Sequence, residues 1–425
     1  MSQPPRHPAR KNRHALGLAR PIMLAWLTYA YLGLLAGLFS GGLCALVVGV
    51  ALSVLWLQML GLGTAILALL CLLPLLRVRL PSPPGFRLTA RKTPKLFETI
   101  KKIRRKTGGT KLDEIRLTED FELRLLLLPR LGFFGWPRKI LLIGLPMLQL
   151  LSRKEIAALL ARQFEHLDGY LDPRGAWLYR LSQTWPALRQ HLEARDSRLA
   201  HLGLGPLRVL LSRFEAASRL FVQDHEYQAD ELGSRIIGPR IMADALIASY
   251  LARCFLDEQF WPRFWARAET SQKPQAPHGT MRAARSACTT REQNERWLRA
   301  ALEHSQVDNE PVLYERLRAL GQVPEQPPLS TYSAAHVLLG EALPHILKDF
   351  DSHWLKIHAR NWEAHRTNMR EAREKVAVFS HCEPENLLAR DQHRYGLALS
   401  RRNPLFGARR ASRSDPGRNR GQASG

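Results

Sequence analysis

The longest pattern in the chain is an apolar block near the N-terminus, residues 21–76, which contains no Asp, Glu, Lys, Arg or His. A membrane-spanning helix needs about 20 apolar residues, so this block predicts two crossings joined by a turn. It also exceeds the roughly 7–15 apolar residues of a secretory signal peptide. Equal division places the turn near residues 48–54, while the glycines at 41–42 and 61–63 are other possible breakers. The alternative is a very long buried hairpin in a soluble protein.

After this block the pattern becomes that of a mixed α and β domain. Residues 80–85 form a Pro- and Gly-rich linker. Residues 93–107 have apolar positions at helical spacing and a basic opposite face, which predicts a helix lying against anionic headgroups or in solvent. Apolar runs of strand length follow it. They are Ile115–Leu117, Leu125–Leu128 and Ile140–Ile143.

The second half of the chain is predicted to be mainly helical. Ser152 and Glu155 form a capping box that begins a helix, and Gly169 ends it. The segments that follow are a helix over roughly 207–237, a loop over 268–292 and helices over 293–375. The expected fold class is therefore α+β, mostly α.

Charge is strongly positive and unevenly placed. The chain has 62 Lys and Arg against 38 Asp and Glu, and most of the net charge of +24 lies in residues 1–20, 77–106 and 401–425. Two of these segments flank the apolar block, and the positive-inside rule places both in the cytosol. We therefore expect a multi-pass protein of the cell (inner) membrane with residues 77–425 cytosolic. Such a charge also fits nucleic acid, but its position beside the block favours a membrane, and no nucleic-acid partner is expected.

Two helical segments carry candidate chemistry: Ala161-Arg-Gln-Phe-Glu-His166 and Asp224-His-Glu-Tyr-Gln-Ala-Asp230. Alone, each is commonplace, because a single His on a helix is most often structural. The five Cys are scattered and include no C-x-x-C pair. That spacing argues against a disulfide-stapled fold and a thiolate zinc site, but not against a zinc site built from His and Glu.

In their order and setting, these segments resemble those of the integral-membrane gluzincin metallopeptidases, the family of HtpX and the CAAX prenyl protease. The resemblance covers roughly residues 115–375, and the preceding membrane hairpin agrees with it. The other segments that carry it are Gly144-Leu-Pro146, Leu151-Ser-Arg-Lys-Glu155, Asp172-Pro-Arg-Gly-Ala-Trp177, Tyr179-Arg-Leu181 and Tyr314-Glu-Arg-Leu-Arg-Ala-Leu-Gly321. The resemblance implies a two-helix transmembrane hairpin, then a zincin-like metallopeptidase domain with additional C-terminal helices.

In that family the first helix carries H-E-x-x-H, whose two His bind zinc and whose Glu is the general base for a zinc-bound water. The resemblance implies that Glu226 has the position of the third ligand and Asp230 that of a residue orienting a ligand His. The residues implied for the substrate groove are Ile140, Leu141, Leu142 and Ile143. They would form a sheet-edge strand that aligns an extended peptide by β-addition.

This chain departs from the motif at its chemical positions. Arg162 replaces the first zinc ligand, Gln163 replaces the general base, and only His166 is retained. Arginine is permanently cationic and cannot ligate a metal, whereas a catalytic zinc needs three protein ligands. Glu226 and His166 are thus vestigial ligands. We expect no cofactor, with zinc bound only if the family activity is retained.

Arg162 has a predicted structural role instead. It lies one helical turn before His166, and the resemblance implies that both residues face the helix that carries Glu226 and Asp230. Two buried carboxylates repel each other unless a cation lies between them. A planar guanidinium suits that position. The sequence therefore predicts that Arg162 lies within salt-bridge distance of Glu226 or Asp230.

Three functions are compatible with these residues. The favoured one is a membrane-anchored pseudopeptidase that binds a protein or peptide partner, in the setting of protein quality control. The first alternative is an active zinc-dependent metalloendopeptidase with a rearranged site. The second is a basic nucleic-acid or anionic-lipid binding protein. Whether the chain is an enzyme depends on which of these holds.

The chain divides into six predicted segments. They are a basic cytosolic N-terminus (1–20), the transmembrane hairpin (21–76), a basic juxtamembrane linker and helix (77–110), the zincin-like domain (111–292), its C-terminal helical part (293–382) and a basic, disordered tail (383–425).

Overall fold

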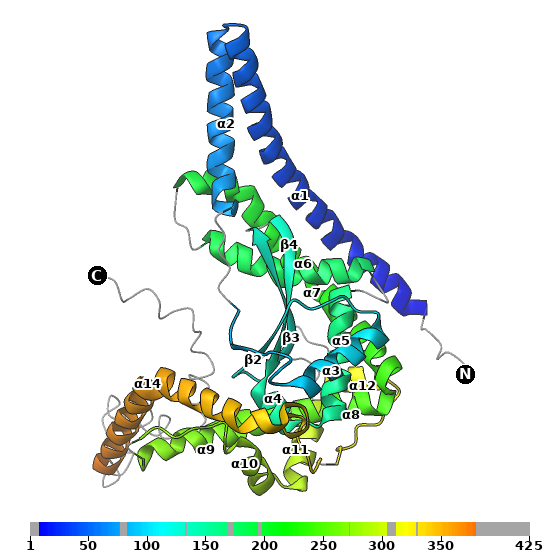
Figure 1. The fold of residues 1–425 in the computed structure, drawn as a ribbon, viewed down its shortest axis with the longest axis vertical. Coiled ribbons are helices and arrows are strands. Elements are labelled where there is room, and N and C mark those ends of the chain that lie inside the picture. The colour runs from blue at the N-terminus through cyan, green and yellow to red at the C-terminus, as the bar shows by residue number, and fades with distance from the viewer. Residues whose placement is uncertain are drawn as a thin grey trace.

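The computed structural model describes residues 8–76, 83–131, 134–168, 173–193, 198–271, 273–303, 312–328 and 330–379 of the 425-residue chain. These residues form a mostly helical α+β structure with a small four-stranded sheet, which confirms the expected fold class at this level. Two long apolar helices project from one end of a helical body, and the sheet lies within that body (Figure 1).

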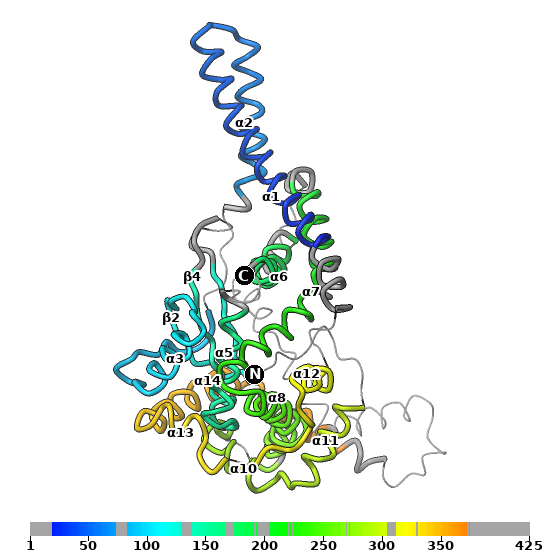
Figure 2. Tube along the Cα trace, turned by 90° about the vertical axis from the view of Figure 1, so that its right-hand side faces the viewer, coloured from blue at the N-terminus to red at the C-terminus, as the bar shows by residue number. Residues whose placement is uncertain are grey.

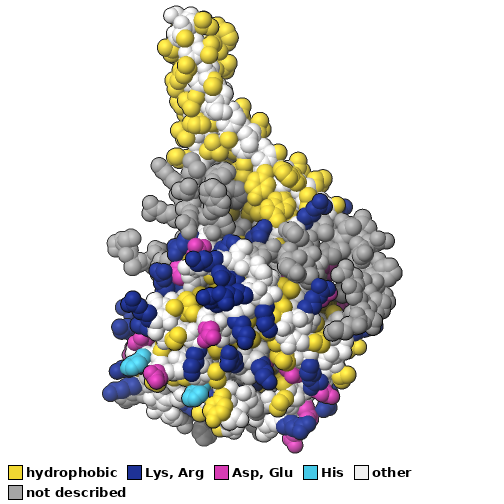
Figure 3. Space-filling view, turned by 45° about the vertical axis from the view of Figure 1, so that its right-hand side comes forward, with side chains coloured by type: hydrophobic (Ala, Val, Ile, Leu, Met, Phe, Trp, Pro, Cys, Tyr) yellow, Lys and Arg dark blue, Asp and Glu magenta, His cyan; other side chains and the backbone are white. Residues whose placement is uncertain are grey.

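The projecting helices are α1 (Pro8–Ala51) and α2 (Leu55–Leu76), which meet at a turn over residues 52–54, inside the predicted window. The segments Ala19–Ala51 and Leu55–Leu73 are long and apolar enough to cross a membrane. In the most apolar 18-residue stretch of each, only 17% and 22% is buried. Figure 3 shows apolar side chains covering the outer surface of this hairpin. A core helix of a soluble protein would be mostly buried, so the exposure favours the membrane interpretation.

Glycines let α1 and α2 approach each other closely. A Cβ atom on Gly61 would lie 2.5 Å from the backbone nitrogen of Leu46, and one on Gly42 would lie 2.7 Å from that of Ala65. Both glycines were possible turn positions by sequence, but they lie inside helices and provide helix–helix contact, as small residues commonly do between membrane helices.

The lower part of α1 connects the hairpin to the body. It lies beside α7 (Arg198–Ile237) in both views of the chain (Figures 1 and 2), and α6 (Pro173–Glu193) packs next to it. The buried side chains that join them include Ala25, Leu32 and Leu35 of α1 with Leu178, Trp185, Leu207 and Phe214 of α6 and α7. Apolar packing therefore sets the direction in which the hairpin leaves the body.

The sheet consists of β1 (Phe86–Arg87), β2 (Glu114–Thr118), β3 (Leu123–Leu131) and β4 (Phe134–Gly144), in the order β1-β2-β4-β3. Strand β4 pairs in parallel with β2 and antiparallel with β3. All three predicted apolar runs are therefore strands, in β2, β3 and β4.

The segment Ile140–Ile143 is not the edge of this sheet, and that prediction was wrong. Within β4, Ile140 pairs with Glu114 of β2 on one side and with Leu126 of β3 on the other. The four residues Ile140, Leu141, Leu142 and Ile143 are at most 1% exposed. Their continuous apolar run is typical of an interior strand covered on both faces. Both of its ladders are filled, so a peptide cannot add to it; at this end of the described sheet the edge is β3.

The rest of the body is helical. Its elements are α3 (Pro94–Thr107), α4 (Leu145–Leu150), α5 (Arg153–Asp168), α8 (Pro239–Cys254), a π-helical segment (Phe255–Phe260), α9 (Trp261–Ala266), a 3₁₀ turn (Arg267–Glu269), α10 (Met281–Cys288), α11 (Arg291–Glu303), α12 (Leu313–Ala319), α13 (Ala334–Leu339), a second 3₁₀ turn (Gly340–Ala342) and α14 (Leu343–Phe379). The expected loop over 268–292 thus contains a helix, α10, whose Met281 and Arg285 are buried. The predicted tail, 383–425, lies outside the described residues.

The amphipathic helix predicted over 93–107 is α3. Its apolar residues Leu96, Ile100 and Ile103 are at most 4% exposed and belong to the main hydrophobic core. The apolar stripe therefore packs against the protein and is not available to a membrane, while the basic face points outward.

The close contact of α1 with α2 gives a first prediction. In Gly61→Ala, the added methyl group would overlap backbone atoms of α1, which cannot move aside as a flexible side chain can. We expect a loss of about 1–3 kcal/mol of stability, the usual cost of overpacking. Thermal melting of the full chain in detergent measures it. Gly63→Ala is the control, because a Cβ at Gly63 meets no atom within 4 Å; equal melting of the two variants would contradict the packing.

Candidate functional site

Helix α5 carries Arg162 and begins at the predicted capping box. The N–H of Ser152 donates to Glu155 Oε2 at 2.6 Å, and the N–H of Glu155 donates to Ser152 Oγ at 3.3 Å, which confirms the box. Gly233 of α7 faces this helix, and a Cβ there would lie 3.4 Å from the carbonyl oxygen of Ala158 and 3.7 Å from Cβ of Arg162. These are ordinary contact distances; the close approach at Gly233 is with α8, because the same Cβ would lie 2.7 Å from Sδ of Met242.

Arg162 contacts both carboxylates of α7. Its Nη2 donates to Glu226 Oε2, and its Nε lies 3.1 Å from Asp230 Oδ1. The side chains are largely buried, with exposed fractions of 12% for Arg162, 14% for Glu226 and 2% for Asp230. Glu226 and Asp230 are one helical turn apart and face the same side. The predicted salt bridge is confirmed, with both carboxylates engaged.

A second arginine, Arg316 of α12, completes the charge balance. Its Nε donates to Asp230 Oδ2 at 2.7 Å and its Nη2 to Asp230 Oδ1 at 2.8 Å, so the guanidinium binds the carboxylate in a bidentate manner. Arg316 belongs to Tyr314–Gly321, one of the segments that carry the resemblance, but the sequence predicts no partner for it. Two guanidinium groups therefore neutralise two carboxylates in a network with little access to water.

Two tyrosines add hydrogen bonds between the helices around this network. The hydroxyl of Tyr179, on α6, donates to Glu226 Oε1 at 3.4 Å. The hydroxyl of Tyr227, on α7, donates to Glu315 Oε2 at 2.6 Å and so links α7 to α12 a second time. Next to Glu226, the fully buried ring of His225 lies 5.0 Å from that of Tyr179. The site thus joins α5, α6, α7 and α12.

The other predicted site residues are not brought into the network by any described contact. Gln163 is 9% exposed, and none of the described interactions joins its side chain to Arg162, Glu226 or Asp230. His166 lies in α5, but its side chain is outside the described part of the structure. The segment Ile140–Ile143 is buried inside the sheet, as described above.

These residues do not fit a catalytic zinc. The guanidinium of Arg162 contacts both carboxylates of the site, and arginine has no lone pair to give a metal. Both oxygens of Asp230 are also engaged by Arg316. Within the described side chains, which do not include that of His166, no group of three His, Cys, Asp or Glu is arranged to hold a metal ion.

Comparison of the chain with protein-family models, with curated proteins and with solved structures finds no match. The function must therefore be inferred from the contacts of Arg162, Glu226, Asp230 and Arg316 and from the apolar hairpin.

The network gives a second prediction. Arg162→Ala leaves Glu226 without its cation and halves the positive charge around Asp230, so we expect a loss of about 3–5 kcal/mol in the free energy of unfolding. Arg235→Ala is the matched control on α7, since Arg235 pairs with Glu231 across one turn and both are nearly half exposed. That change should cost less than about 1 kcal/mol. Thermal melting of both purified variants checks this, and equal losses would show that the network does not stabilise the domain.

Proposed function

We propose that this protein is a membrane-anchored, catalytically inactive relative of zinc metallopeptidases that acts by binding a protein or peptide partner. The observation that carries this proposal is the position of the Arg162 guanidinium between Glu226 and Asp230. In the family that the chain resembles, a zinc-binding His stands at the position of Arg162, and the metal supplies the positive charge beside the carboxylates.

The convergence of separate segments supports the zincin-like scaffold. The resemblance rests on stretches of sequence far apart in the chain, in α5, α6, α7 and α12. Their residues Arg162, Tyr179, Asp230 and Arg316 take part in one network.

Two changes argue against hydrolysis. Arg162 places a cation where a metal would bind, and Gln163 has no group that can accept a proton from water. Loss of a general base alone removes about 10²–10⁴ in rate. The rearranged-site alternative would need new ligands, and the only retained ones are His166 and Glu226, of which Glu226 already binds Arg162.

Binding does not require that chemistry. A partner peptide cannot add a strand at residues 140–143 of β4, which are paired on both sides, so we place it at β3, the longer of the two edge strands of the described sheet. Strand β3 lies against α5 and α6, so a peptide there would pass near the Arg162 network.

Membrane topology gives a third prediction. With basic segments on both sides of the hairpin, residues 77–425 belong in the cytosol of a bacterial cell with the hairpin in the inner membrane. A cytosol-active reporter enzyme fused after residue 110 should be active, and an export-dependent reporter at the same position should be silent. Activity from the exported reporter alone would refute this topology.

The inactive site gives a fourth prediction, tested by metal analysis. The unmodified protein should carry no stoichiometric zinc after purification with added zinc. Arg162→His should gain zinc without peptidase activity, whereas Arg162→His with Gln163→Glu should gain both, because only the pair restores a ligand and a base. Arg162→Gln is the control, since it removes the cation without adding a ligand. Stoichiometric zinc in the unmodified protein would contradict the proposed function.

A further inference from the structure

One face of the four-stranded sheet carries arginines. Side chains alternate between the two faces of a strand, and alternate residues of β2 belong to the main hydrophobic core. The remaining ones, Glu114 and Arg116, therefore lie on the opposite face. The strand pairing puts Arg87 of β1 directly opposite Arg116, and Ile140 of β4 opposite Glu114. Arg138 is two residues before Ile140, so it shares this face.

Three arginines of this face meet at the carboxylate of Glu114, whose side chain is 2% exposed. Arg116 Nε lies 2.7 Å from Glu114 Oε1, and Arg138 Nη2 lies 2.6 Å from Oε2. Arg87 Nε lies 3.9 Å from Oε1. One buried negative charge thus orients three positive ones, and the cluster keeps a net charge of +2.

Two of the three guanidinium groups are open to solvent. The side chain of Arg87 is 67% exposed and that of Arg138 is 44% exposed, against 22% for Arg116. Within the described part of the chain, neither Arg87 nor Arg138 pairs with a second carboxylate, whereas the nearby Arg124 is neutralised by Glu122 at 2.7 Å. A guanidinium has five N–H donors in a planar fork, which suits an oxyanion that approaches from outside.

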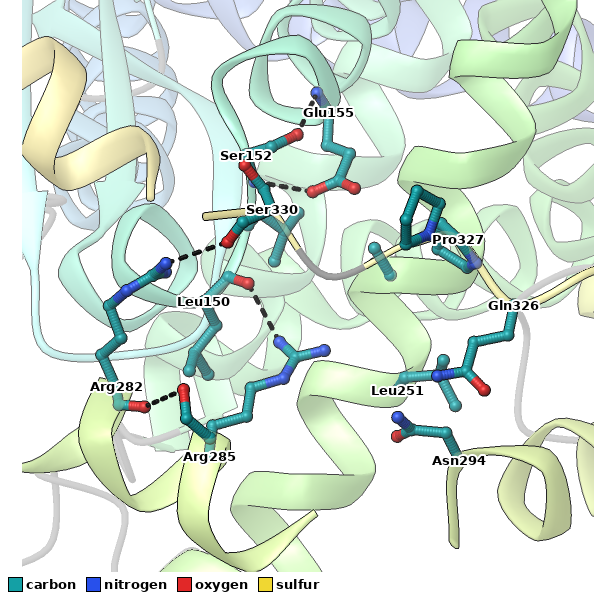
Figure 4. Close-up of a pocket in the computed structure, with 14 residues that line it drawn as sticks. Leu150, Ser152, Glu155, Leu251, Arg282, Arg285, Asn294, Gln326, Pro327 and Ser330 are labelled. Carbon is teal, nitrogen blue, oxygen red and sulfur yellow. Dashed lines mark hydrogen bonds between the residues drawn. The ribbon is translucent and has the colours of Figure 1, made fainter. Parts of the chain in front are cut away.

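A second pair of arginines in the body lacks this freedom. Arg282 and Arg285 line a cavity of about 50 Å³ at the start of α5, together with Glu155 and mostly apolar neighbours (Figure 4). Arg282 donates to three backbone carbonyl oxygens, and Arg285, which is 6% exposed, donates to that of Leu150. The protein itself takes up these donors, so the exposed cluster around Glu114 is the better site for an external anion.

The cluster lies toward the hairpin. Strand β4 ends at α4, away from the hairpin, so its first residues, including Arg138, lie on the hairpin side of the body (Figure 1). Arg116 Nη1 donates to the carbonyl oxygens of Pro83 and Gly85 at 2.6 and 3.1 Å. Pro83 follows Leu76, the last residue of α2, by seven positions (76 to 83), which at full extension cover at most about 25 Å. The cluster is therefore fixed to the segment that leaves the hairpin.

We infer that Arg87, Arg116 and Arg138 bind the phosphate of an anionic phospholipid headgroup at the cytosolic surface of the membrane. The headgroup layer extends roughly 5–8 Å beyond the hydrocarbon core, so lipid phosphates lie just past the level at which α2 ends. A phosphodiester has two free oxygens that the exposed guanidinium groups can share. The net positive charge of the cluster favours an anionic lipid over a zwitterionic one, whose cation it repels. This site rests on the membrane anchorage in the proposed function, but not on the loss of catalysis.

The test titrates the full chain in neutral detergent with phosphatidylglycerol, phosphatidylcholine, inorganic phosphate or a short single-stranded oligonucleotide, at equal ionic strength, and measures the melting temperature. Phosphatidylglycerol should bind saturably and raise it. Phosphatidylcholine should bind at least fivefold more weakly. Inorganic phosphate should also bind at least fivefold more weakly, because its local concentration is not raised by acyl chains in the detergent layer around the hairpin. A response to phosphate or to the oligonucleotide at least as strong as that to phosphatidylglycerol would overturn the lipid assignment.

Arg138→Gln should weaken the binding of phosphatidylglycerol about fivefold, the effect of one cation near an anionic surface. Arg87→Gln is a second variant with the same expected effect, and its distance of 3.9 Å from Glu114 makes it the less disruptive to folding. Arg291→Gln is the matched control. Arg291 is 83% exposed on α11, at the end of the body away from the hairpin (Figure 1), and its loss should leave affinity unchanged.

Alkaline extraction of vesicles that contain the unmodified chain tests the anchorage separately. Release of the chain by alkali would refute the anchorage and this site with it. If the chain is retained, an equal response to the two lipids, or a response to phosphatidylglycerol that both Arg138→Gln and Arg87→Gln leave unchanged, would overturn the inference alone.

Discussion

The structure of the body depends on the burial of two carboxylates, Glu226 and Asp230, on one face of α7. Buried carboxylates without cations would repel each other and lose their hydration, which costs several kcal/mol for each ion. Arg162 and Arg316 reach them from two other helices and remove this cost. Because each arginine belongs to a different element, charge neutralisation also fixes where α5 and α12 lie against α7.

The same contacts limit the chemistry of the site. A guanidinium that holds two carboxylates occupies their lone pairs, and it repels any second cation that approaches them. Stability and metal binding therefore compete for Glu226. The balance of two positive and two negative charges, with Asp230 only 2% exposed, favours a structural role for these residues.

The two ends of the molecule differ in polarity, and α5 and α7 connect them. Toward the hairpin, α7 joins α6 and the lower part of α1 in an apolar cluster around Trp185 and Phe214. Toward the opposite end, the start of α5 borders a cavity with a positively charged lining.

Sequence alone determined the features that depend on neighbours along the chain. The apolar helical hairpin, a turn within residues 48–54, the capping box of α5 and the helical spacing of Glu226 and Asp230 all follow from local pattern. The resemblance placed the two motif helices face to face, and charge complementarity then predicted that Arg162 pairs with Glu226 or Asp230. Only the tertiary structure decided that β4 lies between β2 and β3, that Arg316 grips a carboxylate 86 positions away, and that Arg285 reaches Leu150 across 135 positions. Strand order and long-range pairing depend on how distant segments pack together, and hydrophobic periodicity carries no record of which segments meet.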